Sequence, residues 1–88
     1  METHDNAMPL CEMPIGSAGV ARRIMGGREF SRRAATLGLT PGADLKVLQN
    51  HGSGPILILV RGARLALGRG EAAKVIVEPI PAEGEPRG

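Results

Sequence analysis

Short runs of apolar residues, separated by glycine and proline, recur along most of the chain. Several of them alternate with polar residues, which is the period-two pattern of a strand with one buried face. One run is almost continuously aliphatic over strand length. The pattern predicts strands at Pro9–Met13, Ala18–Met25, Ala43–Gln49, Pro55–Val60, Ala63–Leu67 and Lys74–Glu78. Five or six short, regularly punctuated strands favour a small antiparallel barrel over a parallel sheet, so the predicted fold class is mainly β.

The stretch between the second and third predicted strands has helical spacing instead. Phe30, Ala34 and Leu37 recur at three- and four-residue intervals, with polar residues on the opposite face. Gly38 stands where a helix C′ residue needs positive φ. The sequence therefore predicts one amphipathic helix over about residues 28–38. A single amphipathic helix cannot bury its own apolar face, so this helix must pack against the β structure.

Turn signals divide the rest of the chain. Pro41-Gly42 is a turn pair that follows the helix, because proline presets φ at one turn position and glycine tolerates the next. Arg61-Gly62 predicts a two-residue hairpin turn between the fourth and fifth strands. A single helical turn is expected at about residues 69–73, before the last strand.

The second predicted strand has an irregular alternation. Val20 and Ile24 share a face with Arg22 in a regular strand, which would bring a cation to the apolar side. Either a β-bulge interrupts the strand, or the aliphatic stem of the arginine crosses the rim of the barrel.

Some aliphatic side chains are predicted to point away from the core. Alternation through residues 55–60 sends Leu57 and Leu59 to the outer face, and Ile76 is expected to point outward in the last strand. Outer positions of such strands are normally polar, so these three residues are candidates for a partner-docking patch. The alternative is that the helix, the N-terminal strand or the second copy of a homodimer covers them.

Length and composition indicate one small domain. The predicted barrel covers residues 9–80, and the polar segments 1–8 and 81–88 are expected to be disordered tails. Cys11 is the one cysteine, which excludes an internal disulfide and is compatible with a reducing compartment. The N-terminus has no apolar signal-peptide core, and no apolar run reaches the roughly 20 residues of a membrane helix. A cytoplasmic location is predicted.

Positive charge is concentrated in the predicted barrel. Residues 10–80 hold ten Lys/Arg and five Asp/Glu, a net charge of +5. Arg28, Arg32 and Arg33 lie on the polar side of the helix and form a second candidate surface, for an acidic partner or anionic headgroups; the alternative is a solvated arginine face. The chain has one Phe and no Trp or Tyr. Single-strand nucleic-acid binders stack bases on aromatic side chains, so no nucleic-acid partner is expected.

Residues that could perform catalysis or bind a metal do not form a recognised pattern. The chain has no nucleophile elbow, phosphate loop or dinucleotide-binding glycine pattern. The available metal ligands include His4, Cys11, Glu12 and His51, and no two of these have the spacing of a known site. The sequence therefore predicts no enzyme activity, no cofactor and no metal site.

Three motifs together resemble the FeoA domain family of bacterial ferrous iron transport. They are the helix and turn GGREFSRRAATLGLTPG at 26–42, the hairpin GPILILVRGARLAL at 54–67, and EAAKVIV at 71–77. The resemblance spans about residues 10–80. One departure is Ala34, where such domains often carry a leucine, so the helix packs with a smaller side chain here.

The resemblance implies an SH3-like barrel with a helix inserted after the second strand. It also implies a partner, the large FeoB-type permease of the same system, which carries a cytosolic GTP-binding domain. The expected role is that of a cytosolic accessory protein that docks on the permease and modulates it. Recruitment to the inner face of the membrane would then occur through the permease alone.

Two other functions are compatible with a small basic barrel. One is a nucleic-acid-binding barrel, which the positive charge favours and the shortage of aromatic residues disfavours. The other is a repressor-type barrel that binds a peptide, because the FeoA barrel resembles the C-terminal domain of iron-dependent repressors. A proline-rich ligand needs an aromatic-lined groove, which this sequence does not offer.

Overall fold

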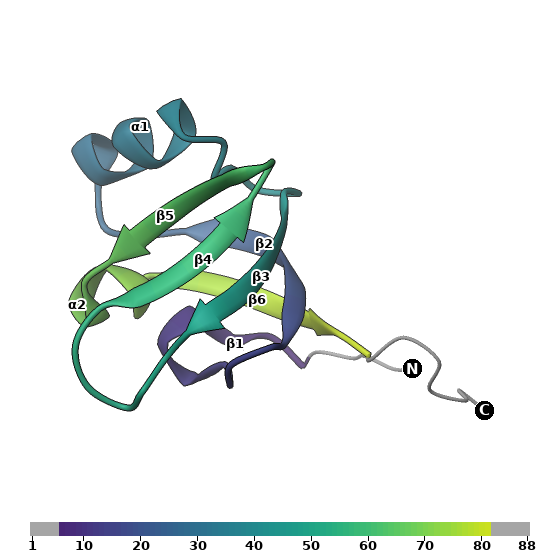
Figure 1. The fold of residues 1–88 in the computed structure, drawn as a ribbon. Helices are drawn as coiled ribbons and strands as arrows, with labels where there is room; N and C mark the ends of the chain where they lie inside the picture. Colours follow the sequence, from purple (N-terminus) through teal and green to yellow (C-terminus); the bar gives the residue numbers. More distant parts are fainter. Residues whose placement is uncertain (1–5, 82–88) are drawn as a thin grey trace.

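A computed structural model describes residues 6–81 of the chain. The predicted tails at 1–8 and 81–88 lie mostly outside this range. Six strands form one antiparallel sheet in the order β1-β6-β2-β3-β4-β5, as Figure 1 shows. The strands are β1 (Met8–Pro9), β2 (Ala18–Ile24), β3 (Asp44–Gln49), β4 (Ile56–Val60), β5 (Ala63–Leu67) and β6 (Val75–Ile80). Two α-helices, α1 (Arg28–Thr36) and α2 (Arg69–Ala72), and a 3₁₀ helix, η1 (Leu10–Glu12), complete the fold. The mainly β fold class is confirmed.

The sheet curls around one aliphatic core, which alternate residues of the strands supply. The predicted inward positions of β3, β4 and β6 are buried, and Leu65 and Leu67 of β5 are buried too. Among the described residues no polar or charged side chain is buried. The core therefore holds the fold through packing and hydrophobic burial, at about 25 cal/mol per Å² of apolar surface.

A β-bulge in β2 resolves the irregular alternation of that strand. The register with β6 shifts between Ala21 and Arg23, so Arg22 is the extra residue. Arg22 turns outward, and its Nε donates to Glu78 Oε1 at 2.7 Å. The buried residues of β2 are thus the small pair Gly19 and Ala21, while Val20 is half-buried. The bulge, rather than a stem crossing the rim, keeps the cation out of the core.

The helix α1 is shorter than predicted, and its apolar face differs at one position. Phe30 and Ala34 are buried as expected, but Leu37 is 41% exposed. Gly38 has φ of +93°, as predicted for a helix C′ residue. The chain reverses there, so Leu39, which is 1% exposed, enters the core in place of Leu37.

The N-terminal segment is not the strand predicted for residues 9–13. It begins with the two-residue strand β1, which includes Met8 and so extends the barrel by one residue, and continues into η1. Met13 N donates to the Leu10 carbonyl at 3.0 Å. In a 3₁₀ turn, residues three apart lie on one side, so Leu10 and Met13 are both fully buried. Leu10 and Met13 are three residues apart, so in a regular strand they would point to opposite faces. In this turn both can point into the core.

Two polar side chains bind η1 to the rest of the barrel. Asn50, in the loop after β3, donates through Nδ2 to the carbonyls of Cys11 at 3.1 Å and Met13 at 2.8 Å. Arg69 of α2 donates to the Cys11 carbonyl at 3.0 Å and to the Gly54 carbonyl at 3.1 Å. These bonds satisfy carbonyls that no strand partner can reach. Asn50 and Arg69 therefore hold η1 against the barrel.

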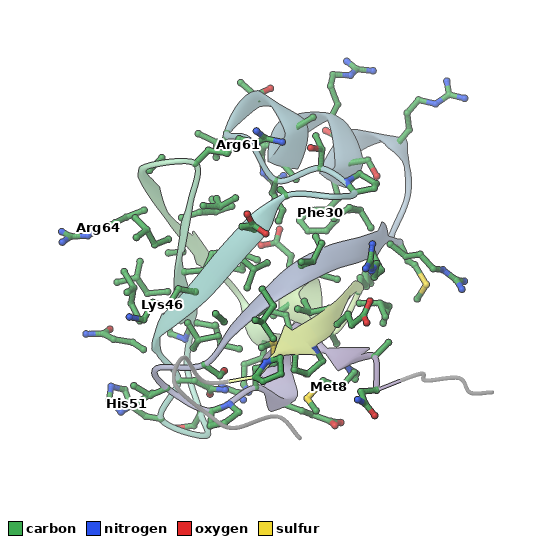
Figure 2. The ribbon with its side chains drawn as sticks, turned by 90° about the vertical axis from the view of Figure 1, so that its right-hand side faces the viewer. Met8, Phe30, Lys46, His51, Arg61 and Arg64 are labelled. Carbon is green, nitrogen blue, oxygen red and sulfur yellow. The ribbon has the colours of Figure 1, made fainter. Side chains whose placement is uncertain are left out.

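The open side of the sheet lies between β5 and β1, which are not hydrogen-bonded neighbours in the described sheet. The helix α1 spans the two ends of β5 (Figure 1): Arg33 pairs with Glu71 of α2, and the Gly38 carbonyl accepts a bond of 3.0 Å from Arg61 Nε. Phe30 lies beneath the helix (Figure 2). The helices thus cover the part of the core that the sheet leaves open.

The strand β6 leaves no room for a side chain at Gly19 of β2. A Cβ atom at this position would lie 2.5 Å from Val77 Cγ1 and 2.8 Å from the Glu78 carbonyl oxygen. We expect Gly19→Ala to lower the free energy of unfolding by about 2 kcal/mol, because β2 and β6 must separate. Urea denaturation measures the loss. Gly70→Ala in α2, where no atom lies within 4 Å, is the matched control and should be neutral or slightly stabilising. Equal stability of the two variants would contradict the packing argument.

The hydrogen bonds of Asn50 give a second stability prediction. Asn50→Ala removes two hydrogen bonds to half-buried carbonyls, and we expect a loss of about 1–3 kcal/mol. Amide hydrogen exchange at Met13, whose N–H closes the η1 turn, should accelerate more than exchange in β4. Uniform acceleration across the sheet would show that the side chain does not hold this segment in particular.

Candidate docking surface

The outer face of β3, β4 and β5 carries two leucines in a row along the central strand. Leu57 and Leu59 are half-buried and lie two residues apart, about 7 Å along the strand. Leu57 lies opposite Gln49 and Ala66, and Leu59 lies opposite Lys46 and Arg64. The prediction that both leucines point away from the core is confirmed. Leu57 therefore has uncharged neighbours on the two adjacent strands, and Leu59 has a cation on each.

A shallow hollow of about 220 Å³ lies beside Leu59, at the end of β4. Its walls come from the outer face of β3, from Leu59 and from the Arg61-Gly62 turn, and the lining residues are Asp44, Leu45, Lys46, Leu59, Arg61 and Gly62. Figure 2 shows Lys46 and Arg64 extending from the same side of the sheet, with Arg61 beside the helix. We call this face, with Leu57, Leu59, Lys46, Arg61 and Arg64, the β4 surface.

Backbone conformation fixes the position of Arg61. Arg61 has φ of +50° and Gly62 has φ of +80°, the pair of positive angles that a type I′ turn requires. This turn confirms the predicted hairpin and sets the register that places Leu59 opposite Arg64. The bond from Arg61 Nε to Gly38 holds the arginine stem against the end of α1.

Ile76, the third predicted docking residue, does not belong to this surface. It lies on β6, opposite Pro9 of β1 and Arg23 of β2, and is half-buried. Two strands, β2 and β3, separate β6 from β4 in the sheet. The three aliphatic residues therefore do not make one contiguous patch, because each strand adds about 4.8 Å of separation.

The three helix arginines are exposed but differ in their contacts. Arg33 forms an ion pair with Glu71, and its guanidinium carbon lies 5.7 Å from the centroid of the Phe30 ring. Arg33 is thus partly engaged within the molecule. Arg28 and Arg32 have no ion pair with another residue of the part that the structure describes. Of the predicted arginine face, these two extend into solvent.

The described residues bring no metal-ligating group together. Within residues 6–81, no three His, Cys, Asp or Glu side chains lie close enough to hold an ion. Cys11 is half-buried and His51 is exposed in the loop after β3; His4 lies outside the described residues. The β4 surface is suited to contact with a partner, and it has no nucleophile and base that converge on one point.

Sequence reasoning missed the cations around Leu59. Arg64 could have been placed there, because the predicted two-residue turn fixes the pairing of β4 with β5. Lys46 could not, because a second bulge shifts the register of β3 and β4 between Val47 and Gln49. A one-residue shift of register moves a side chain to another neighbour, and no local signal marks this bulge.

The single curled antiparallel sheet places this chain in the class of small SH3-like folds. One solved structure of this class is FeoA of Stenotrophomonas maltophilia, determined with zinc and described as a prokaryotic SH3 domain protein. It is 28% identical to this chain, with a TM-score of 0.68, and the match covers 81% of this chain and 89% of the other.

Other comparisons identify the family. The FeoA domain model matches residues 8–79. A crystal structure of an iron uptake regulatory protein (FeoA) is 42% identical, with a TM-score of 0.79, over 84% of this chain and 99% of that one. A Methanocaldococcus jannaschii protein named as an Fe(2+) transport protein A is 34% identical over 77 residues, which are 88% of this chain and 93% of the relative. The chain belongs to the FeoA family.

Membership of the FeoA family confirms the predicted class of function at a coarse level. The family consists of small accessory proteins of Fe(2+) transport, and it is not a family of enzymes. Residues 6–81 contain no helix long and apolar enough to cross a membrane.

Proposed function

We propose that this chain is a cytoplasmic accessory protein of ferrous iron uptake that docks on the cytosolic GTP-binding domain of a FeoB-type permease and modulates it. The observation that carries the proposal is the apolar and basic β4 surface on a member of the FeoA family. Because the FeoA family is not a family of enzymes, the proposed role depends on surface contacts. Paired leucines on the outer face of a strand are an apolar contact that a partner can dehydrate.

The exposed arginines of α1 supply a second contact in this proposal. Arg28 and Arg32 carry charge that can attract acidic residues of the permease domain or the headgroups around it. Exposed charges change the association rate and its salt dependence more than the final affinity. The leucines therefore hold the complex, and the arginines direct its formation.

The competing functions have less support. A nucleic-acid role needs exposed aromatic side chains for stacking, and the single aromatic residue, Phe30, is buried beneath α1. A groove for a proline-rich peptide needs aromatic walls, and the hollow beside Leu59 has none. A homodimer that covers Leu57 and Leu59 is the alternative that shares the same residues.

The central test replaces one outer leucine by a charged residue. Leu57→Glu should leave the fold intact, because the side chain is outside the core, and should abolish co-purification with the soluble GTP-binding domain of a cognate permease. Ile80→Glu, at an exposed apolar position on β6, which β2 and β3 separate from β4, is the control and should bind normally. The GTP turnover of the permease domain, measured in parallel, should respond to the unmodified chain and to Ile80→Glu alone.

Two outcomes contradict this assignment. A folded Leu57→Glu chain that still co-purifies with the permease domain removes the leucines from the interface. Sedimentation that shows a dimer for the unmodified chain and a monomer for Leu57→Glu, with no binding of the permease domain by either, assigns the surface to self-association. A gel shift with mixed RNA and DNA at moderate salt, if positive, would favour the nucleic-acid function.

The role of the helix arginines predicts a salt dependence. Arg32→Glu should weaken binding to the permease domain about fivefold at low ionic strength. The difference should shrink at 0.5 M NaCl, because ions screen exposed charges within a few ångströms. Arg23→Glu, on β2, serves as the control for net charge. Affinity that is unchanged between low and high salt would rule out steering by these residues.

A further inference from the structure

Strand register places one cation on either side of Leu59 on the β4 surface. Lys46 and Arg64 lie directly opposite Leu59 on the two neighbouring strands, where directly paired residues have Cβ atoms about 5 Å apart. Arg61 lines the end of the same hollow. Leu59 is thus an apolar residue with a cation on each neighbouring strand and a third cation in the turn at the end of β4.

The volume of the hollow limits what it can receive. At about 220 Å³, it is smaller than the roughly 300–1,000 Å³ of pockets that hold a cofactor or a drug-sized ligand. A nucleotide does not fit within it. A single side chain of a partner protein does, and an open hollow on the outside of the sheet suits a side chain that arrives with its own backbone.

The charge of the hollow selects an acidic side chain. Asp44 is the one acid among its lining residues, against the cations Lys46 and Arg61, with Arg64 beside them. Two other acids of the domain, Glu71 and Glu78, form ion pairs with α1 and β2 and do not neutralise this face. The local balance is therefore positive.

The bond that holds Arg61 lowers the cost of binding an anion. Its Nε donates to the Gly38 carbonyl, so the stem is already ordered before a ligand arrives. The two Nη groups can then form the paired hydrogen bonds that a guanidinium makes with a carboxylate.

We propose that the hollow beside Leu59 receives a glutamate or aspartate of a partner segment, and that an aliphatic residue of the same segment packs on Leu57 and Ala66. The ligand is an acidic–aliphatic protein segment. The carboxylate is bound by Lys46, Arg61 and Arg64. The aliphatic side chain is bound by the uncharged part of the surface around Leu57, two residues before Leu59 on β4. As a statement about the permease this rests on the proposed function, because it names the chemistry that the β4 surface recognises.

Nucleic acid is the other polyanion to consider. A phosphate backbone would use the cations, but it would leave the two leucines against a charged, hydrated strand. The surface offers no aromatic side chain on which a base could stack. Paired leucines beside cations therefore match an acidic protein segment better than a nucleic acid.

The test uses the full chain, labelled with ¹⁵N, and three probes in separate NMR titrations. The first is the capped peptide Gly-Glu-Leu-Glu-Leu-Gly, the second the same peptide with lysine for glutamate, and the third an eight-nucleotide single-stranded DNA. The acidic peptide should shift the amide signals of residues 44–49, 57–60 and 63–66. Lys46→Glu should weaken its binding about fivefold, and Leu59→Ser should weaken it about tenfold. Lys74→Glu, an exposed lysine after α2, is the matched control and should bind normally.

Several results would overturn the proposal. The lysine peptide could bind as well as the acidic peptide, or the DNA could bind more tightly at the same amides. The acidic peptide could shift only signals of α1, or no signals at all. Folded Lys46→Glu could bind the acidic peptide with unchanged affinity. The permease assay separates this proposal from the proposed function. Peptide binding without permease binding would leave the surface chemistry intact and remove the permease as partner. Permease binding that survives both Lys46→Glu and Leu59→Ser would retain the partner and reject the acidic–aliphatic site.

Discussion

This structure depends on closing a sheet that does not close itself. The six strands curl around the core, but the edge strands β1 and β5 are not hydrogen-bonded to each other. The core exposed along that side must be covered by other elements. The helix α1 contributes Phe30 and Ala34, and η1 with its C-cap residue contributes Leu10 and Met13. Hydrogen bonds from Asn50 and Arg69 hold η1 in place. An aliphatic domain this small buries only about 60–65% of its unfolded surface, so each covering element matters to its stability.

This arrangement gives the molecule two sides with different structural roles. One side is occupied with closing the barrel, and even its charged groups, such as Arg33 and Glu71, bind one another. Apart from Arg61, which bonds to the end of α1, the β4 surface takes no part in closure. Its two leucines, with Lys46 and Arg64, can therefore change without loss of the core, which is the condition under which a surface can be adapted to a partner.

Much of the fold could be predicted from local signals, because each strand has its own period-two pattern and each turn its own glycine. The helix end at Gly38 and the Arg61-Gly62 hairpin are examples. The parts that could not be predicted depend on contacts between distant segments. The η1 turn exists because Leu10 and Met13 both find space in the core, and Leu39 replaces Leu37 because of how the chain re-enters the barrel. For the candidate site, alternation predicted that Leu57 and Leu59 point outward, whereas the separation of Ile76 from them follows from a strand order that no local pattern contains.

Arg61 links two parts of the molecule that are otherwise independent. Its positive φ forms the hairpin turn, its stem packs on Gly38, and the residue is one of those that line the hollow beside Leu59. On the proposed site, a carboxylate that binds Arg61 contacts the same side chain that satisfies the carbonyl at the end of α1. Occupancy of the hollow and order at the carboxyl end of the helix would then be thermodynamically coupled, and by reciprocity a change that loosens the helix end would alter the affinity of the hollow.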